Sequence, residues 1–168
     1  MAVRPVLRIP HPGLKAAAPA GSSASEGALA TDLVDTMRAS PACVGLAAPQ
    51  IGVARRAFVV DVTGHPKATA CHGLIVVFEP VAITAAGRAI GREGCLSVPD
   101  FTADVARATQ IVVRGLGVAG EEVVVAAEGF EARALQHEID HLDGLLILDR
   151  VASLATDVFR RRIYGSRS

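Results

Sequence analysis

The segment QHEIDHLDG, residues 136–144, restricts the fold more than any other part of the chain. His137 and His141 stand four positions apart, and positions i and i+4 lie on one face of a helix, about one turn apart. Both imidazoles can therefore reach a single metal ion if the segment is helical. Glu138 lies about 100° further round such a helix, which places its carboxylate beside the ion and not on it. The surrounding stretch FEARALQHEIDHLDG has helical periodicity, and Gly144 is expected to end the helix.

This segment alone does not decide between a metal site and a pair of ordinary helix histidines, because short motifs recur by chance. A catalytic tetrahedral site needs three protein ligands and one open position. No histidine follows His141, and the later carboxylates are only Asp143, Asp149 and Asp157.

A third ligand is available upstream, in GREGCLSVP at residues 91–99. Cys95 stands between glycines and a proline, on what we expect to be an irregular segment with an exposed thiol. One thiolate and two imidazoles suit a soft or borderline divalent metal. The alternative for Cys95 alone is a small buried hydrophobic residue.

A further motif, VGLAAPQIG, covers residues 44–52. Gly45 and Gly52 allow a backbone to approach a ligand closely, and the amide of Gln50 can donate to an oxyanion next to a metal. Read alone, the motif is equally a tight loop that packs on a helix.

Composition limits the class of protein. Hydrophobic residues make up 51% of the 168 residues and charged residues 20%, which predicts a globular chain, and we expect one domain over residues 1–168. Seventeen basic and 17 acidic residues cancel, which predicts no direct nucleic-acid specificity and no polybasic membrane anchor. The N-terminus lacks the apolar run of a signal peptide, and three cysteines are too few for a disulfide framework. These features predict a cytoplasmic protein.

The remaining periodicity predicts an α+β fold, with antiparallel strands in a meander packed around the central helix that carries HExxH. An N-terminal helix should begin after Ser25, bury Leu29, Leu33, Val34 and Met37, and end near Ser40. A C-terminal helix is predicted at about 151–163, with Leu154, Val158 and Phe159 on its apolar side. The strands are expected at residues 57–62, 74–79, 81–84, 110–116 and 121–128, with a hairpin turn in GVAGEE between the last two.

Taken together, three segments resemble the peptide deformylase family, whose motifs run GΦGΦAAxQ, EGCLS and QHExDH. This chain has CVGLAAPQ at 43–50, EGCLS at 93–97 and QHEIDH at 136–141, in the same order. The opening VLRIPHPGL is also similar, and the resemblance extends to about Val151. Two departures are Cys43, where the family usually has glycine, and Glu79, where it usually has asparagine.

The resemblance implies a hydrolase that removes the formyl group from the N-terminal formylmethionine of nascent polypeptides. It implies one divalent metal on Cys95, His137 and His141, with Fe²⁺ favoured and Zn²⁺, Ni²⁺ or Co²⁺ as alternatives. Glu138 would be the general base and acid that takes a proton from the metal-bound water.

The same resemblance assigns the oxyanion to the metal, the Gln50 amide and the backbone N–H of Leu96. The peptide would lie extended between the segments around Gly45 and Gly94. Val44, Phe130 and Ala134 are candidates for the methionine pocket, or plain core residues. We expect a monomer whose partners are nascent N-formylmethionyl peptides. A transient ribosome contact through the tail is a further hypothesis, and the tail arginines are Arg160, Arg161, Arg162 and Arg167.

Several other polar residues are interpreted as structural. His11 is expected in a turn, and His65, Cys71 and His72 in a mobile loop without a second metal. Arg133, Asp140 and Asp143 are expected at the surface, although the two aspartates could instead bind the histidine N–H groups. Glu93 and Arg107 are predicted to form an ion pair near the site.

Two rival functions remain at this point. A zinc endopeptidase would use the same metal, water and base on an internal peptide bond. A protein that binds formyl peptides or metal without turnover would also carry these motifs, with Cys43 altering the site.

Overall fold

The computed structural model describes residues 2–21 and 26–162. The helical segments are η1 (Pro12–Lys15), α1 (Glu26–Ala39), η2 (Ala48–Ile51), α2 (Gly129–Leu142) and α3 (Ile147–Arg150). The strands are β1 (Gly45–Ala47), β2 (Ala57–Val60), β3 (Ile75–Ala86), β4 (Ala89–Cys95), β5 (Val98–Arg107), β6 (Gln110–Leu116), β7 (Glu122–Glu128) and β8 (Val158–Arg160).

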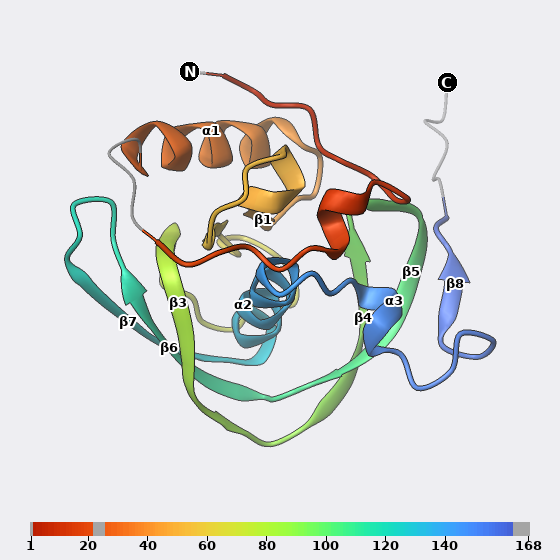
Figure 1. Cartoon of the computed structure of the whole chain (residues 1–168). Helices are drawn as coiled ribbons and strands as arrows, with labels where there is room; N and C mark the ends of the chain where they lie inside the picture. The colour runs from red at the N-terminus through yellow and green to blue at the C-terminus, as the bar shows by residue number, and fades with distance from the viewer. Residues whose placement is uncertain (1, 22–25, 163–168) are drawn as a thin grey trace.

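The strands form two antiparallel sheets around α2 (Figure 1). One sheet has five strands in the order β1-β2-β3-β6-β7, and the other has three in the order β4-β5-β8. The predicted α+β class is confirmed. Strands β1 and β4 are both edge strands of their sheets, which leaves one side of each free of a neighbour.

Strand β2 shows how the sequence produces the core. Its four residues AFVV are all buried, because helices cover both faces of this part of the sheet. Phe58 and Val60 pack in one apolar cluster with residues of α2, whereas Ala57 and Val59 pack in another with residues of α1. A strand buried on both faces reads as a continuous apolar run, as this one does.

Most of the predicted elements are present. Helix α1 ends at Ala39, next to the expected stop at Ser40, and it buries Leu33 and Met37. Its predicted cap, Ser25, lies outside the described residues. Strands β6 and β7 and the turn between them are confirmed. The two runs predicted at 74–79 and 81–84 form one strand, β3, with a register shift between Phe78 and Val81.

Two predictions were wrong. Residues 151–157 are not helical, and Val158–Arg160 form strand β8, which pairs with β5. Cys95 is neither on an irregular segment nor exposed: it is the last residue of β4, it pairs with Val98 across a two-residue turn, and it is buried. In both places pairing with a neighbouring strand overrides the local pattern.

Within the described part of the chain, no helix combines the length and the apolar character needed to cross a membrane.

Candidate metal centre and substrate cavity

Helix α2 brings His137 and His141 to one side of the site. The helix packs on the five-stranded sheet through Ala132, Ala134, Leu135 and Leu142. The two imidazole rings face each other edge to face, with their centroids 5.0 Å apart. His137 bonds through Nδ1 to Glu93 Oε1 at 2.8 Å. This contact leaves Nε2 as the nitrogen available to a ligand.

Cys95 completes the cluster from the end of β4. Its Sγ lies 3.3 Å from Nε2 of His141, and one ligand atom from each of Cys95, His137 and His141 lies within 4.8 Å of the others. Burial acts to raise the pKa of the Cys95 thiol, but the charges and hydrogen bonds of His141 and His137 outweigh it and lower that pKa well below 9.0. A thiolate is the form that binds a metal.

The donor set fits one soft or borderline divalent ion, which needs three protein ligands and an open position. One observation supports this fit. Oε2 of Glu138, beside the cluster, is buried without a hydrogen-bond partner among the described residues, and unpaired buried polar atoms are uncommon in proteins. The described residues contain no second cluster of this kind.

Glu138 lies beside this cluster and is 4% exposed. Burial raises the pKa of its carboxyl group to about 7, although the nearby His137 and His141 act in the opposite direction. The backbone of Gly45 touches the same carboxylate, since a Cβ at Gly45 would lie 2.5 Å from Oε1. Only glycine leaves room for Glu138 in this position.

Gln50 is held in the same buried region. Its Oε1 accepts from the backbone N–H of Ala47 at 2.9 Å, and Nε2 donates to Ser97 Oγ at 3.1 Å and to Cys95 Sγ at 3.7 Å. This fixes which end of the amide faces the cysteine. The N–H groups of Gln50 therefore point to the side of the site where Cys95 ends β4.

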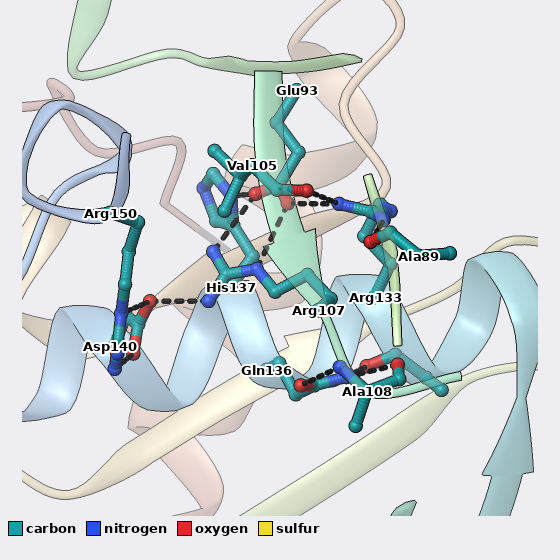
Figure 2. Close-up of polar contacts among 11 residues, drawn as sticks. Ala89, Glu93, Val105, Arg107, Ala108, Arg133, Gln136, His137, Asp140 and Arg150 are labelled. Atoms are coloured by element: carbon teal, nitrogen blue, oxygen red, sulfur yellow. Dashed lines mark hydrogen bonds and ion pairs between the residues drawn. The ribbon is translucent and has the colours of Figure 1, made fainter. Parts of the chain in front are cut away.

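A network of charged side chains from β4, β5 and α2 binds His137 of the cluster (Figure 2). Glu93 accepts hydrogen bonds from Arg107 Nε and Nη2, both at 2.9 Å, and from Arg133 Nη1 at 2.8 Å. Although burial acts to raise it, the pKa of the Glu93 carboxyl is lowered far below its ordinary value by His137 and Arg107. Asp140 pairs with Arg107 and Arg150. The predicted pair of Glu93 and Arg107 is confirmed.

The network corrects two sequence-based interpretations. Arg133 is not a solvated surface residue, because it also donates to the carbonyl oxygens of Val105 and Ala89 at 2.8 and 2.9 Å. Asp140 is 5% exposed and bound by two arginines, so its expected surface position was wrong. Asp143 is exposed and pairs with Arg56, as a surface residue can.

The cluster opens into a cavity of about 340 Å³. The residues assigned to the substrate from the sequence line it, namely Val44, Gly45, Gly94, Phe130 and Ala134, and so do Gln50, Leu96 and Glu138. Cys43 also lines it, and burial raises the pKa of its thiol to about 12. No sequence motif pointed to His65, Lys67, Arg92 and Arg161, which also line this cavity.

The remaining polar residues have structural contacts. His11 accepts from the N–H of Gly13 at 3.1 Å, which confirms its place in a turn. His65 stacks on the ring of Phe130 with centroids 4.1 Å apart. His72 binds the buried Glu131 through its N–H and Nδ1, both at 2.7 Å. The loop that carries these histidines is thus fixed to α2 at two points.

Comparison with known proteins agrees with this geometry. The sequence model of the family described as Polypeptide deformylase matches residues 3–157. A peptide deformylase of Xylella fastidiosa strain M12 is 41% identical over 172 residues, which cover 99% of this chain and 98% of that protein. One from Halothermothrix orenii is 47% identical over 130 residues, or 77% of this chain and 80% of the relative.

Solved structures give the same result. The crystal structure of a peptide deformylase from Legionella pneumophila superposes with a TM-score of 0.80 at 38% identity, covering 91% of this chain and 88% of that one. A class I type b peptide deformylase from Acinetobacter baumannii gives 0.81 at 34% identity, covering 90% and 100%. Sequence, fold and cavity thus lead to one conclusion: the chain belongs to the polypeptide deformylase family.

Proposed function

We propose that this chain hydrolyses the N-formyl group from the N-terminal formylmethionine of nascent polypeptides, releasing formate and a free amino terminus. Membership of the polypeptide deformylase family makes it a peptide deformylase, a metal-dependent hydrolase. The observation that carries the proposal is the convergence of Cys95, His137 and His141 beside the buried carboxylate of Glu138. We further propose one catalytic domain over residues 1–168, acting as a cytoplasmic monomer.

Cys95, His137 and His141 would hold one divalent ion, Fe²⁺ by family resemblance, with Zn²⁺, Ni²⁺ or Co²⁺ as alternatives. When bound, such an ion would lower the pKa of a water molecule and polarise the formyl oxygen. Glu93 holds the ring of His137 through Nδ1, and a partner of this kind fixes the orientation and tautomer of a ligating histidine.

Glu138 would move the proton. Its carboxylate would take a proton from the attacking water and later give it to the departing amine. Burial raises the pKa of this carboxyl group, which favours the step in which it takes up the proton. Gly45 and the burial of the side chain restrict the carboxylate to one position.

Gln50 and Leu96 would stabilise the oxyanion formed when water attacks the formyl carbon. The donors are the Nε2 amide of Gln50, held in place through its bond to the Ala47 N–H, and the backbone N–H of Leu96, which follows Cys95 in the turn. Loss of one such donor typically raises the barrier by about 3–4 kcal/mol.

The substrate peptide would lie extended between β1 and β4. Both are edge strands, so their backbones can pair with an added strand. Gly45 in β1 and Gly94 in β4 line the cavity on these edges. The methionine side chain would enter the space lined by Val44, Phe130 and Ala134, next to the ring of His65 that stacks on Phe130.

A paired assay tests this proposal. Protein loaded with Fe²⁺ without oxygen is offered a formylmethionyl peptide and its unformylated counterpart, and formate and all peptide products are measured. We expect formate from the first and no product from the second. Cleavage of an internal bond with the formyl group untouched would instead favour an endopeptidase, and absence of any product would favour a protein that binds without turnover.

The Glu138→Gln variant tests the assigned proton carrier. We expect turnover to fall by at least about 100-fold, within the usual range for a general base, while the metal content stays unchanged. Glu131→Gln is a matched control. Glu131 is a similarly buried glutamate on the same helix, but its carboxylate binds His72. Turnover retained in Glu138→Gln would refute the assignment.

A transient ribosome contact through the arginines of the tail is the remaining part of the proposal. Arg160, Arg161 and Arg162 lie on or just after β8, and Arg167 lies outside the described residues. Ribosome binding that is unchanged after deletion of residues 160–168 would exclude this contact.

A further inference from the structure

Strand β8 carries the C-terminal part of the chain to the mouth of the substrate cavity. It pairs with β5 so that Arg160 lies opposite Phe101, and the N–H of Arg161 continues the pairing by donating to Asp100 O at 2.8 Å. Figure 1 shows β8 alongside β5, at the edge of the three-stranded sheet. As a result, Arg161 lines the same cavity as Cys95 and His137, two of the three proposed metal ligands.

The side chain of Arg161 lies against the end of β4. Its Nη2 donates to the carbonyl oxygen of Cys95 at 3.2 Å, and a Cβ at Gly94 would lie 2.8 Å from the same nitrogen. Nε of Arg161 is buried without an acceptor among the described residues. No carboxylate of the described residues forms an ion pair with this guanidinium.

The other charged side chains that line the described part of the cavity form no ion pair with Arg161. Lys67 also lines the cavity and has no ion pair with a described residue. The two carboxylates that line the cavity are Glu93 and Glu138, and Glu93 already binds Arg107 and Arg133. Arg92 differs from Arg161, because it pairs with Asp104 at 2.6 Å and stacks over the ring of Phe159.

We propose that Arg161 binds a side-chain carboxylate of the substrate peptide, at the second or third residue, and so favours formylmethionyl peptides with an acidic residue there. The proposal rests on the proposed function, which places the peptide along the edge of β4 at Gly94. A planar guanidinium with one donor on a carbonyl keeps further N–H groups, and these match the two oxygens of a carboxylate. Lys67 adds positive potential to the same opening.

The test compares peptides that differ only in one charge. Formyl-Met-Ala-Asp amide is compared with formyl-Met-Ala-Asn amide, and formyl-Met-Asp-Ala amide with formyl-Met-Asn-Ala amide. The amides remove the terminal carboxylate, so that only the side chain can supply the charge. At low salt we expect kcat/KM to be about threefold to tenfold higher for the aspartate peptide than for the asparagine peptide in at least one pair. This range lies between the usual contribution of an exposed ion pair and that of a hydrogen bond to a charged group.

The variants assign the preference to one side chain. Arg161→Gln should bring the aspartate-to-asparagine ratio close to one, and Arg161→Lys should retain part of it. Arg160→Gln is the matched control, because Arg160 is the exposed last residue of β8, next to Arg161, and it does not line the cavity. The quantity compared is a ratio within each variant, so a general change in activity divides out.

The outcomes separate this proposal from the proposed function. Equal rates for aspartate and asparagine peptides in the unaltered protein would overturn the role of Arg161 while confirming deformylation. A ratio that survives in Arg161→Gln would also overturn it. Absence of formate from every peptide would refute the function itself. If Arg161→Gln does not fold, inhibition of the unaltered protein by unformylated Met-Ala-Asp and Met-Ala-Asn amides gives the same comparison, with the aspartate product expected to inhibit more strongly.

Discussion

Helix α2 is attached to the two sheets in different ways. On the side of the five-stranded sheet, its contacts are apolar and come from Ala132, Ala134, Leu135 and Leu142. The apolar cluster of the three-stranded sheet contains no residue of α2 among the described residues. On that side, His137, Arg133 and Asp140 of α2 instead bind Glu93 of β4 and Arg107 of β5.

The two kinds of contact have different consequences for the site. Burial of apolar side chains stabilises the folded state but is non-directional. Hydrogen bonds between charged groups, in contrast, restrict the distance and orientation of the two side chains that form them. Cys95 is on β4 and both histidines are on α2, so the charged side sets how far the sulfur lies from the ring nitrogens. We infer that the apolar side holds the fold together and that the charged side holds the ligand geometry.

Replacing Arg107 with methionine should have the largest effect on stability and zinc affinity, because it removes the ion pairs of Arg107 with Glu93 and Asp140 on the charged side of α2. Glu93 and Asp140 would be left as buried carboxylates without the cation that lies between them. We expect the free energy of unfolding to fall by about 3–5 kcal/mol. Zinc affinity should fall by about 10–100-fold, because Glu93, the partner of His137, loses the two hydrogen bonds from Arg107 that hold it in place. Chemical denaturation of metal-free protein and a zinc titration measure the two effects.

The control for this variant is Asp104→Asn, which breaks the more exposed pair of Arg92 and Asp104 on the same hairpin. It should cost about 1 kcal/mol or less and leave zinc affinity unchanged. Similar losses in the two variants would contradict a special role for the buried network.

Replacing Leu135 with alanine breaks the apolar side. Leu135 is completely buried in the cluster between α2 and the five-stranded sheet, so the change should cost about 2–5 kcal/mol. In contrast to Arg107→Met, the folded fraction should keep its zinc affinity. Leu154→Ala serves as the control, because Leu154 is 67% exposed. A loss of zinc affinity as large as that in Arg107→Met would remove the distinction between the two sides.

The same division explains what could be predicted from the sequence. The apolar side follows local periodicity, and the pattern of FEARALQHEIDHLDG predicted helix α2 and its end before Gly144. Both histidines and Glu138 were placed by helix geometry alone. Cys95 was found as a motif residue, but its strand was not recognised, because β4 carries glycines and charged residues where a buried strand usually has apolar ones.

The charged side depends on partners that are distant in the sequence. Arg133 and Asp140 look like surface residues until Glu93 and Arg107 are brought to them from β4 and β5. The C-terminal helix was predicted from the spacing of Leu154, Val158 and Phe159, but pairing with β5 decides the structure there. Arg161 could not be assigned to the cavity for the same reason.

Gly45 in β1 is the residue of the five-stranded sheet whose backbone contacts Glu138, and a substitution there tests this contact. In Gly45→Ala, the new Cβ would lie 2.5 Å from Oε1 of Glu138 and 2.9 Å from its Cδ, so the carboxylate must move. We expect kcat to fall by up to about 100-fold, as for a catalytic group displaced by about 1 Å, with less effect on unfolding. Gly27→Ala is the control, because its nearest contact would be 3.7 Å away. An unchanged kcat would show that Glu138 tolerates the displacement.

The smallest expected effect concerns a surface charge pair next to the three-stranded sheet. Asp149 in α3 accepts from Lys15 in η1 and from the N–H of Leu146. Burial acts to raise the pKa of Asp149, but the hydrogen bonds from Lys15 and Leu146 outweigh it, and the pKa lies below its ordinary value of 3.8. The unfolded chain therefore takes up this proton more readily than the folded chain does. The carboxylate contributes stability above the unfolded pKa and loses it as the pH falls through the lower, folded value.

Asp149→Asn isolates this contribution, because asparagine keeps an oxygen for the Leu146 N–H but not the charge. At neutral pH we expect the variant to be less stable by about 1 kcal/mol or less, as for other partly exposed pairs, and added salt should reduce the difference. Unfolding curves at a series of pH values should show the two proteins converging as the pH falls below 3.8. A difference that persists well below this pH would mean that the lost interaction is not the charge of Asp149.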